Sequence, residues 1–181
     1  MLTLNILKEQ TRIKKQQKLE NPDAYEHWDE FILLCYNTRT PQSYGALIEK
    51  RIIKLNGFRK LKSELNIGDA EENGFNKEIK ISISADDEQP TFNIVQIRPH
   101  ANISSYLIWF IEIDKECNIL NHTFEVPKED MMKIPGVGGA HGTKESNVNQ
   151  KNIEYRVTVK KNSAAWKFLQ PYTRKMKWQR I

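Results

Sequence analysis

The stretch from Glu78 to Ser84 constrains the fold of this chain more than any other part of its sequence. Charged or hydroxyl side chains alternate strictly with isoleucines along it. Because successive side chains of a β-strand point to opposite faces of a sheet, this period of two predicts a strand with one isoleucine face. The other face carries Glu78, Lys80, Ser82 and Ser84. The sequence therefore predicts an acid and a lysine side by side on a half-buried strand.

A turn signal just before this strand predicts the strand's neighbour. The pair Asn73-Gly74 is typical of a tight β-hairpin, because both residues tolerate the positive φ angles of such a turn. This hairpin would fold Asp69 back beside Glu78. Two carboxylates next to the ammonium group of Lys80 suit a divalent metal ion and an oriented water molecule, which phosphodiester hydrolysis requires. A solvated surface pair of Glu78 and Lys80 is the alternative interpretation.

The remaining patterns predict an α/β (α+β) fold with a mixed central β-sheet flanked by helices. Helices are expected over residues 4–19, from Pro22 onward, over 43–56, over 128–133 and over 163–179 with an interruption at Pro171. Strands are expected over residues 67–71, 77–84, 92–98, 106–113, 119–126 and 153–160. Residues 106–113 are almost entirely apolar, which is typical of a central strand covered on both faces.

Length and composition indicate one soluble domain over residues 1–181, because a chain of 181 residues can bury one substantial core. Its apolar runs fall short of the roughly 20 residues that a membrane-spanning helix needs. The N-terminus lacks the apolar core of a signal peptide. Two cysteines, Cys35 and Cys117, suit a reducing compartment. We therefore expect a cytoplasmic protein without a membrane partner.

The net charge of +5 is distributed unevenly along the chain. Residues 1–68 carry a net charge of +4, residues 69–134 carry −7 and residues 135–181 carry +8. An acidic centre between basic flanks suits a protein that concentrates metal cations at its centre and grips a polyanion around them. A generally basic surface without a nucleic-acid partner is the simpler alternative.

A third carboxylate is expected to point inward from the third predicted helix. At about 100° per residue, Glu49 falls between Ile52 and Ile53 and away from Lys50 and Lys54. An inward carboxylate is costly unless it is paired or bound to a metal. Glu49 is therefore expected to be either a further metal ligand or water holder, or a salt-bridge partner at the edge of the core.

Together these residues resemble the PD-(D/E)XK nuclease motif. Asp69, Glu78 and Lys80 match its three characteristic positions, and Glu49 matches the helical acid that many members carry. Within that superfamily, the stretch is most similar to type II restriction endonucleases of the PvuII kind. There too, an Asp-Ala pair is followed by an acid-rich turn with glycine and then by a Glu-x-Lys sequence. Gly68 stands where the motif has its proline.

The resemblance implies a restriction-endonuclease-like core and a magnesium-dependent endonuclease. Asp69, Glu78 and the carbonyl of Ile79 would hold Mg²⁺, with Glu49 as a further ligand or water holder. Lys80 would position the attacking water and stabilise the developing negative charge. The products would carry a 5′-phosphate and a 3′-hydroxyl.

The resemblance also implies partners. Cutting both strands of a short palindromic site in double-stranded DNA with one site per chain implies a homodimer. A cognate DNA methyltransferase is expected in the same system. Residues 1–40 are expected to form a helical region that dimerises or embraces the DNA.

Two segments are expected to contact DNA bases or phosphates. The first offers alternating polar side chains, namely Gln96, Arg98, His100 and Asn102. Arginine reads guanine, and glutamine or asparagine reads adenine, in the major groove; a polar edge with a proline bend is the alternative. The second is a glycine-rich flexible loop over residues 136–151, which either closes over DNA or only connects two elements. It contributes the donors His141, Thr143 and Lys144.

Two other classes of function remain open at the level of the sequence. A junction resolvase or a repair nickase would use the same fold and the same metal site. A non-catalytic nucleic-acid-binding protein would keep the basic flanks and use the Glu78 and Lys80 pair only as a salt bridge. The leading interpretation is a type II restriction endonuclease.

Overall fold

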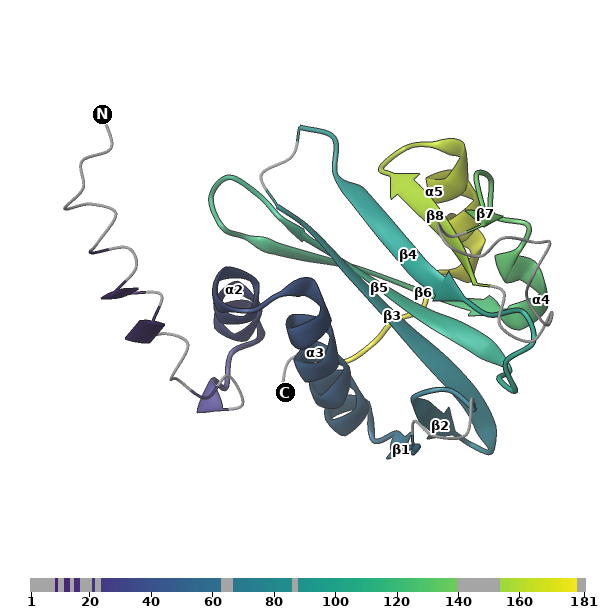
Figure 1. The fold of residues 1–181 in the computed structure, drawn as a ribbon, viewed down its shortest axis with the longest axis horizontal. Coiled ribbons are helices and arrows are strands. Elements are labelled where there is room, and N and C mark those ends of the chain that lie inside the picture. Colours follow the sequence, from purple (N-terminus) through teal and green to yellow (C-terminus); the bar gives the residue numbers. More distant parts are fainter. Residues whose placement is uncertain are drawn as a thin grey trace. The chain divides into compact units, whose positions relative to one another are not determined.

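The computed structural model describes residues 24–62, 67–85, 88–139 and 154–178, together with a few positions before residue 24 (Figure 1). The chain divides into two compact units. The first comprises residues 1–55 and 177–181, and the second comprises residues 56–176. The single nuclease domain expected over residues 1–181 stays a prediction.

The first unit contains helices α2 (Trp28–Thr38) and α3 (Pro41–Asn56). Their apolar residues recur at helical spacing and are buried, as at Phe31, Cys35, Ile48 and Ile52. Helix α3 confirms the prediction over residues 43–56, whereas the helix expected from Pro22 onward begins at Trp28. The helix predicted over residues 4–19 lies largely outside the described residues. None of the helices that the structure describes is long and apolar enough to cross a membrane.

The second unit is built on a mixed five-stranded sheet (Figure 1). Its strands are β1 (Arg59–Lys60), β2 (Ala70–Glu72), β3 (Phe75–Ala85), β5 (Ser105–Ile113) and β6 (Ile119–Pro127), in the order β1-β2-β3-β5-β6. Strands β3 and β5 are parallel, and the other neighbours are antiparallel. The prediction of a mixed α and β fold with a mixed central sheet is confirmed, and the short strand β1 is an addition to it.

A second, antiparallel sheet lies against the first. It contains β4 (Thr91–Ile97), β8 (Tyr155–Lys160) and β7 (Gly138–Gly139), in the order β4-β8-β7. The backbone N–H groups of Thr91 and Asn93 in β4 donate to the hydroxyls of Ser84 and Ser82 in β3, at 3.0 and 2.9 Å. These hydroxyls therefore connect the two sheets, so the polar face of β3 is covered at its serine end.

Helical elements complete the second unit at its C-terminal end. They are α4 (Lys128–Met131), α5 (Ala164–Leu169) and the 3₁₀ turn η4 (Gln170–Tyr172). The helix predicted over residues 163–179 is too long, because Pro171 falls in η4 and the chain then becomes extended. Thr173 forms a β-bridge with Phe124, and the N–H of Arg174 donates to the carbonyl of Thr123 at 2.9 Å. Residues 173 and 174 therefore lie along β6.

The core of the second unit lies between the two sheets. Strand β5 is buried at every position except Glu112, which confirms that it is a central strand. Its even-numbered residues Tyr106, Ile108 and Phe110 belong to a core cluster with side chains of β4, β6, β8 and α5. Phe110 stacks on Phe92 with ring centroids 4.4 Å apart. In the parallel register Glu78 pairs with Tyr106, so the polar residues of β3 and the apolar core residues of β5 lie on the same face of the sheet.

The hairpin predicted at Asn73-Gly74 is present. Asn73 and Gly74 have φ angles of 52° and 85°, as a type I′ turn requires. The turn joins β2 to β3 in the register that pairs Glu72 with Phe75 and Ala70 with Lys77.

Gly68 is required by the same hairpin. Its φ angle is +89°, and a Cβ atom at this position would lie 2.4 Å from the carbonyl oxygen of Lys77. Proline is fixed near a φ angle of −65°, so this backbone excludes the proline that the nuclease motif carries. The glycine found in the sequence is therefore a consequence of how closely the chain approaches β3.

Replacing Gly68 with alanine should destabilise the protein more than replacing Gly74. At Gly74 a Cβ atom meets nothing within 4 Å, so Gly74→Ala has only the left-handed backbone to disfavour it, about 1–2 kcal/mol. Gly68→Ala adds the clash with Lys77, for a total of about 2–5 kcal/mol. Urea unfolding of both variants measures the difference. Equal losses of unfolding free energy would contradict the close approach.

Candidate active site

Asp69 lies opposite Glu78, one position beyond the last residue pair of the β2–β3 ladder. The backbone N–H of Asp69 donates to the carbonyl of Lys77 at 2.8 Å. The Asp69 carboxylate continues the pairing, because its Oδ2 accepts the N–H of Ile79 at 2.8 Å. Two hydrogen bonds therefore fix this carboxylate at the edge of β3.

Glu78 and Lys80 lie next to this carboxylate on the polar face of β3. The Nζ atom of Lys80 donates to Oε1 of Glu78 at 2.8 Å. Their side chains are 14% and 11% exposed, so the pair is partly shielded from water, unlike an ordinary surface salt bridge. The structure thus brings Asp69, Glu78 and Lys80 together, as the hairpin signal predicted.

The carbonyl of Ile79 faces the same edge of β3. In a strand, the N–H and the C=O of one residue point toward the same neighbouring strand. The Ile79 N–H points to Asp69, so its carbonyl oxygen also points to the side on which Asp69 lies. The main chain of Ile79 therefore offers an oxygen beside the two carboxylates.

The electrostatics of this group favour a cation. Burial raises the pKa of the Asp69 carboxyl, and the nearby Glu78 carboxylate raises it further. The Ile79 N–H, Lys80 and Lys60 act in the opposite direction but do not outweigh these two effects. Ionisation of Asp69 therefore costs more in the folded protein than in the unfolded chain, and a divalent cation between the two carboxylates would relieve that cost.

The donor set fits Mg²⁺ better than a softer metal. Mg²⁺ binds oxygen, keeps several of its waters, and is commonly held by one or two carboxylates. Asp69, Glu78 and the Ile79 carbonyl supply oxygen only. Within the described part of the chain, no three His, Cys, Asp or Glu side chains group as they would around a protein-enclosed metal ion. The arrangement therefore suits an ion that is held by two carboxylates and keeps several of its water ligands.

Glu49 lies on α3 in the first unit and is half-buried. Glu49 takes part in an interaction within the protein. Asp69, Glu78 and Lys80 belong to the second unit. The role of Glu49 as a metal ligand or water holder stays a prediction.

The first predicted DNA-contacting segment is not a continuous strand. Strand β4 ends at Ile97, after a bulge at which Gln96 has a φ angle of +55°. A turn follows, in which the N–H of Ala101 donates to the carbonyl of Arg98 at 3.0 Å. The four polar side chains therefore do not share one strand face, and the backbone matches the alternative of a polar edge with a bend at Pro99. Gln96, His100 and Asn102 are exposed, and Arg98 is half-buried.

Arg98 is held by two residues that the sequence analysis did not single out. Its guanidinium contacts Glu154, and its backbone is bonded to the hydroxyl of Tyr106. Glu154 lies 56 positions away along the chain, so no local pattern indicates the pair. The remaining predicted DNA-contacting residues, His141, Thr143 and Lys144, lie outside the described residues.

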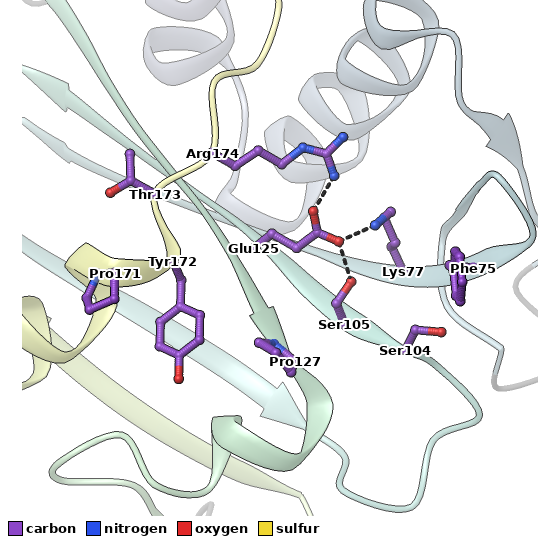
Figure 2. Close-up of a pocket in the computed structure, with 10 residues that line it drawn as sticks. All are labelled: Phe75, Lys77, Ser104, Ser105, Glu125, Pro127, Pro171, Tyr172, Thr173 and Arg174. Atoms are coloured by element: carbon purple, nitrogen blue, oxygen red, sulfur yellow. Dashed lines mark hydrogen bonds and ion pairs between the residues drawn. The ribbon is translucent and has the colours of Figure 1, made fainter.

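A charged network on the opposite face of β3 was also missed. The buried ammonium group of Lys77 contacts the carboxylates of Glu125 and Glu72, and Arg174 bridges the same two carboxylates. Ser105 donates to Glu125 at 2.8 Å. Figure 2 shows the side chains of Lys77, Ser105 and Arg174 converging on Glu125. These four residues line a pocket of about 530 Å³. The network ties the β2–β3 hairpin to β5, β6 and Arg174.

This network should make stability fall in acid. The hydrogen bond from Arg174 lowers the pKa of Glu72. Burial raises the pKa of Glu125, but Lys77, Ser105 and Arg174 outweigh it and hold this pKa below its usual value. A carboxyl with a lowered pKa stabilises the folded state above its unfolded pKa, and this stabilisation is lost as the pH falls through the folded pKa.

Lys77→Met should therefore destabilise the protein by about 2–4 kcal/mol at neutral pH. This loss is smaller than that expected on breaking a fully buried ion pair, because both carboxylates are partly exposed. The loss should shrink as the pH falls through the lowered pKa values of Glu72 and Glu125, since the wild-type protein then loses the same ion pairs. Urea unfolding across this pH range measures it, with Lys115→Met at an exposed position as the control. A loss that does not depend on pH would contradict the network.

Asp69→Asn should stabilise the protein without added metal. An acid with a raised pKa binds protons more readily in the folded state than in the unfolded state. Its contribution to stability therefore declines as the pH rises from the unfolded pKa through the folded pKa. The amide removes the charge while its oxygen still accepts the Ile79 N–H. The melting temperature at neutral pH should rise, and Mg²⁺ should stabilise the wild-type protein more than the variant.

Asp114→Asn provides a control of opposite sign. Hydrogen bonds from Asn118 lower the pKa of Asp114, so the same exchange should reduce the melting temperature at neutral pH. A fall in both variants would contradict the assignment of Asp69 as a disfavoured charge.

No protein-family model matches the chain, and no curated protein is significantly similar to it.

Proposed function

We propose that this protein is a Mg²⁺-dependent endodeoxyribonuclease of the PD-(D/E)XK superfamily, and specifically a type II restriction endonuclease. The observation that carries the proposal is the placement of Asp69 opposite Glu78, with Lys80 bonded to Glu78 at 2.8 Å. These are the three residue types and spacings of the nuclease motif. The mixed central sheet that bears them supports a restriction-endonuclease-like core.

Each residue has a separate role in the proposed reaction. Asp69, Glu78 and the Ile79 carbonyl hold the metal ion, with Glu49 proposed as a further ligand or water holder. Bound Mg²⁺ supplies charge neutralisation at the scissile phosphate and lowers the pKa of a bound water. The ammonium group of Lys80 orients the attacking water and stabilises the negative charge that develops on the phosphate.

The substrate and assembly follow from the same proposal. A short specific site in double-stranded DNA is cut on both strands by a homodimer, leaving 5′-phosphate ends. The charge distribution supports a polyanionic partner, because residues 135–181 carry a net charge of +8. A cytoplasmic location and a cognate DNA methyltransferase, which protects the host's own sites, belong to the proposal.

Removal of Lys80 or Asp69 should abolish most cleavage. Plasmid and phage DNA incubated with Mg²⁺ should give discrete bands, and Lys80→Ala and Asp69→Ala should each lower the cleavage rate about 100-fold or more. Lys115→Ala, at an exposed position outside the site, should cut at the wild-type rate. Thermal unfolding of all variants separates loss of chemistry from loss of fold.

The products of the same assay distinguish the rival functions. Nicks confined to branched or damaged DNA would indicate a resolvase or a repair nickase. Binding of DNA without any metal-dependent cleavage would indicate a non-catalytic protein. Undiminished cleavage by the two variants would reject the assigned site.

A further inference from the structure

We propose that Glu154 and Tyr106 are positioning residues that hold Arg98 in one orientation, so that its guanidinium recognises a guanine in the DNA substrate. This inference rests on the proposed function and adds a determinant of sequence specificity to it. It assigns roles to two residues outside the nuclease motif, and it follows from how Arg98 is held at both its side chain and its backbone.

Glu154 fixes the side chain of Arg98. Its Oε1 accepts a hydrogen bond from Nε of Arg98 at 2.8 Å and forms an ion pair with Nη2, also at 2.8 Å. Strand pairing brings the two residues together, because Ile97 pairs with Tyr155 in the antiparallel β4–β8 register and the next positions are Arg98 and Glu154. The side chains are 33% and 29% exposed, so the guanidinium is both anchored and accessible.

Tyr106 fixes the backbone of Arg98. Its hydroxyl accepts the N–H of Arg98 at 2.8 Å and donates to the carbonyl of the same residue at 3.0 Å. The ring of Tyr106 is fully buried in the core of the second unit. Arg98 therefore follows the end of β4 at a position set by a rigid side chain of β5.

The anchor also connects Arg98 to the candidate metal site. Tyr106 is the register partner of Glu78 across the parallel β3–β5 pair. A residue bonded to the hydroxyl of Tyr106 is thus placed relative to the strand that carries Glu78 and Lys80. Recognition by Arg98 and cleavage at Asp69 and Glu78 would consequently occur at a fixed separation along the DNA.

The remaining chemistry of Arg98 suits a base better than a phosphate. A guanidinium has five N–H groups. The hydrogen bond to Glu154 uses the one on Nε, and the ion-pair contact occupies at most one on Nη2, so at least three are left. Two of these are enough for the bidentate contact to O6 and N7 of guanine. The Glu154 carboxylate offsets the charge of Arg98, which weakens attraction to any phosphate while leaving the directional donors in place.

Preorganisation gives this arrangement its effect. A free arginine side chain must be ordered when it binds, whereas Arg98 is already ordered by the two contacts on its guanidinium. A guanidinium held in one plane also adapts less well than a free arginine to a base whose acceptors are in other positions. Loss of either anchor should therefore relax the choice of base more than it slows the chemistry.

The test is a selection from random-sequence duplex DNA with two readouts. In Mg²⁺ the ends of cleaved fragments are sequenced, and in Ca²⁺ the duplexes retained by the full chain are sequenced without cleavage. The wild-type protein should require guanine at one position of each half-site. Arg98→Ala should lower that preference about 5- to 100-fold, and Glu154→Gln and Tyr106→Phe should each lower it at least about 5-fold.

Matched controls separate positioning from stability. Glu116→Gln makes the same exchange at an exposed residue, and Tyr172→Phe removes a hydroxyl that donates to Asp130 instead. Both should keep the wild-type preference. Cleavage rates on the preferred site should change less than the base preference in Glu154→Gln. This variant keeps the size of the side chain but removes the charge that holds Arg98, so it serves even if Tyr106→Phe fails to fold.

The outcomes distinguish this inference from the proposed function. Cleavage with an unchanged base preference in both Glu154→Gln and Arg98→Ala would overturn the inference and leave the nuclease intact. Retention of guanine-containing duplexes in Ca²⁺ without cleavage in Mg²⁺ would reject the nuclease and keep the recognition. Absence of any base preference in the wild-type protein would overturn the inference.

Discussion

The pairing of Asp69 with Lys77 across the β2–β3 hairpin is the constraint on which the candidate site depends. The type I′ turn at Asn73-Gly74 sets the register, and the approach at Gly68 brings the chain against β3 closely enough for this hydrogen bond. Once the register is fixed, the Asp69 carboxylate meets the Ile79 N–H and lies opposite Glu78. A shift of one residue would move Asp69 to a different partner and separate the two carboxylates.

The two faces of β3 carry different groups of charged side chains. One face carries Glu78 and Lys80, which join Asp69 in a group whose burial and like charges favour a bound cation. The next residue toward the turn, Lys77, points to the other face and neutralises two carboxylates there. That second network is internally balanced in charge, with two acids against a lysine and Arg174, and so suits a structural role. The strand is thus anchored by ion pairs on one face and carries the candidate metal site on the other.

Local signals in the sequence predicted strand β3 and its hairpin, but they did not predict the contacts between residues far apart in the chain. The alternation after Glu78 and the Asn73-Gly74 turn each describe neighbours within a few residues, so strand β3 and the position of Asp69 could be derived. Contacts of Lys77 with Glu125, and of Arg98 with Glu154, join residues 48 and 56 positions apart. Nothing in local periodicity encodes them. Of the two interpretations of the segment after Gln96, the polar edge with a bend at Pro99 describes its backbone, and the bend is a local signal.

The most direct measurement of the central claim is the location of a divalent metal in crystals of the protein. Crystals soaked in Mn²⁺, an anomalous scatterer that takes the same oxygen ligands as Mg²⁺, should show one anomalous peak bound by the carboxylates of Asp69 and Glu78 and by the carbonyl of Ile79. Metal–oxygen distances should be about 2.0–2.2 Å. Crystals of Asp69→Asn should lose the peak. A peak elsewhere, or none in the wild-type crystals, would contradict the account.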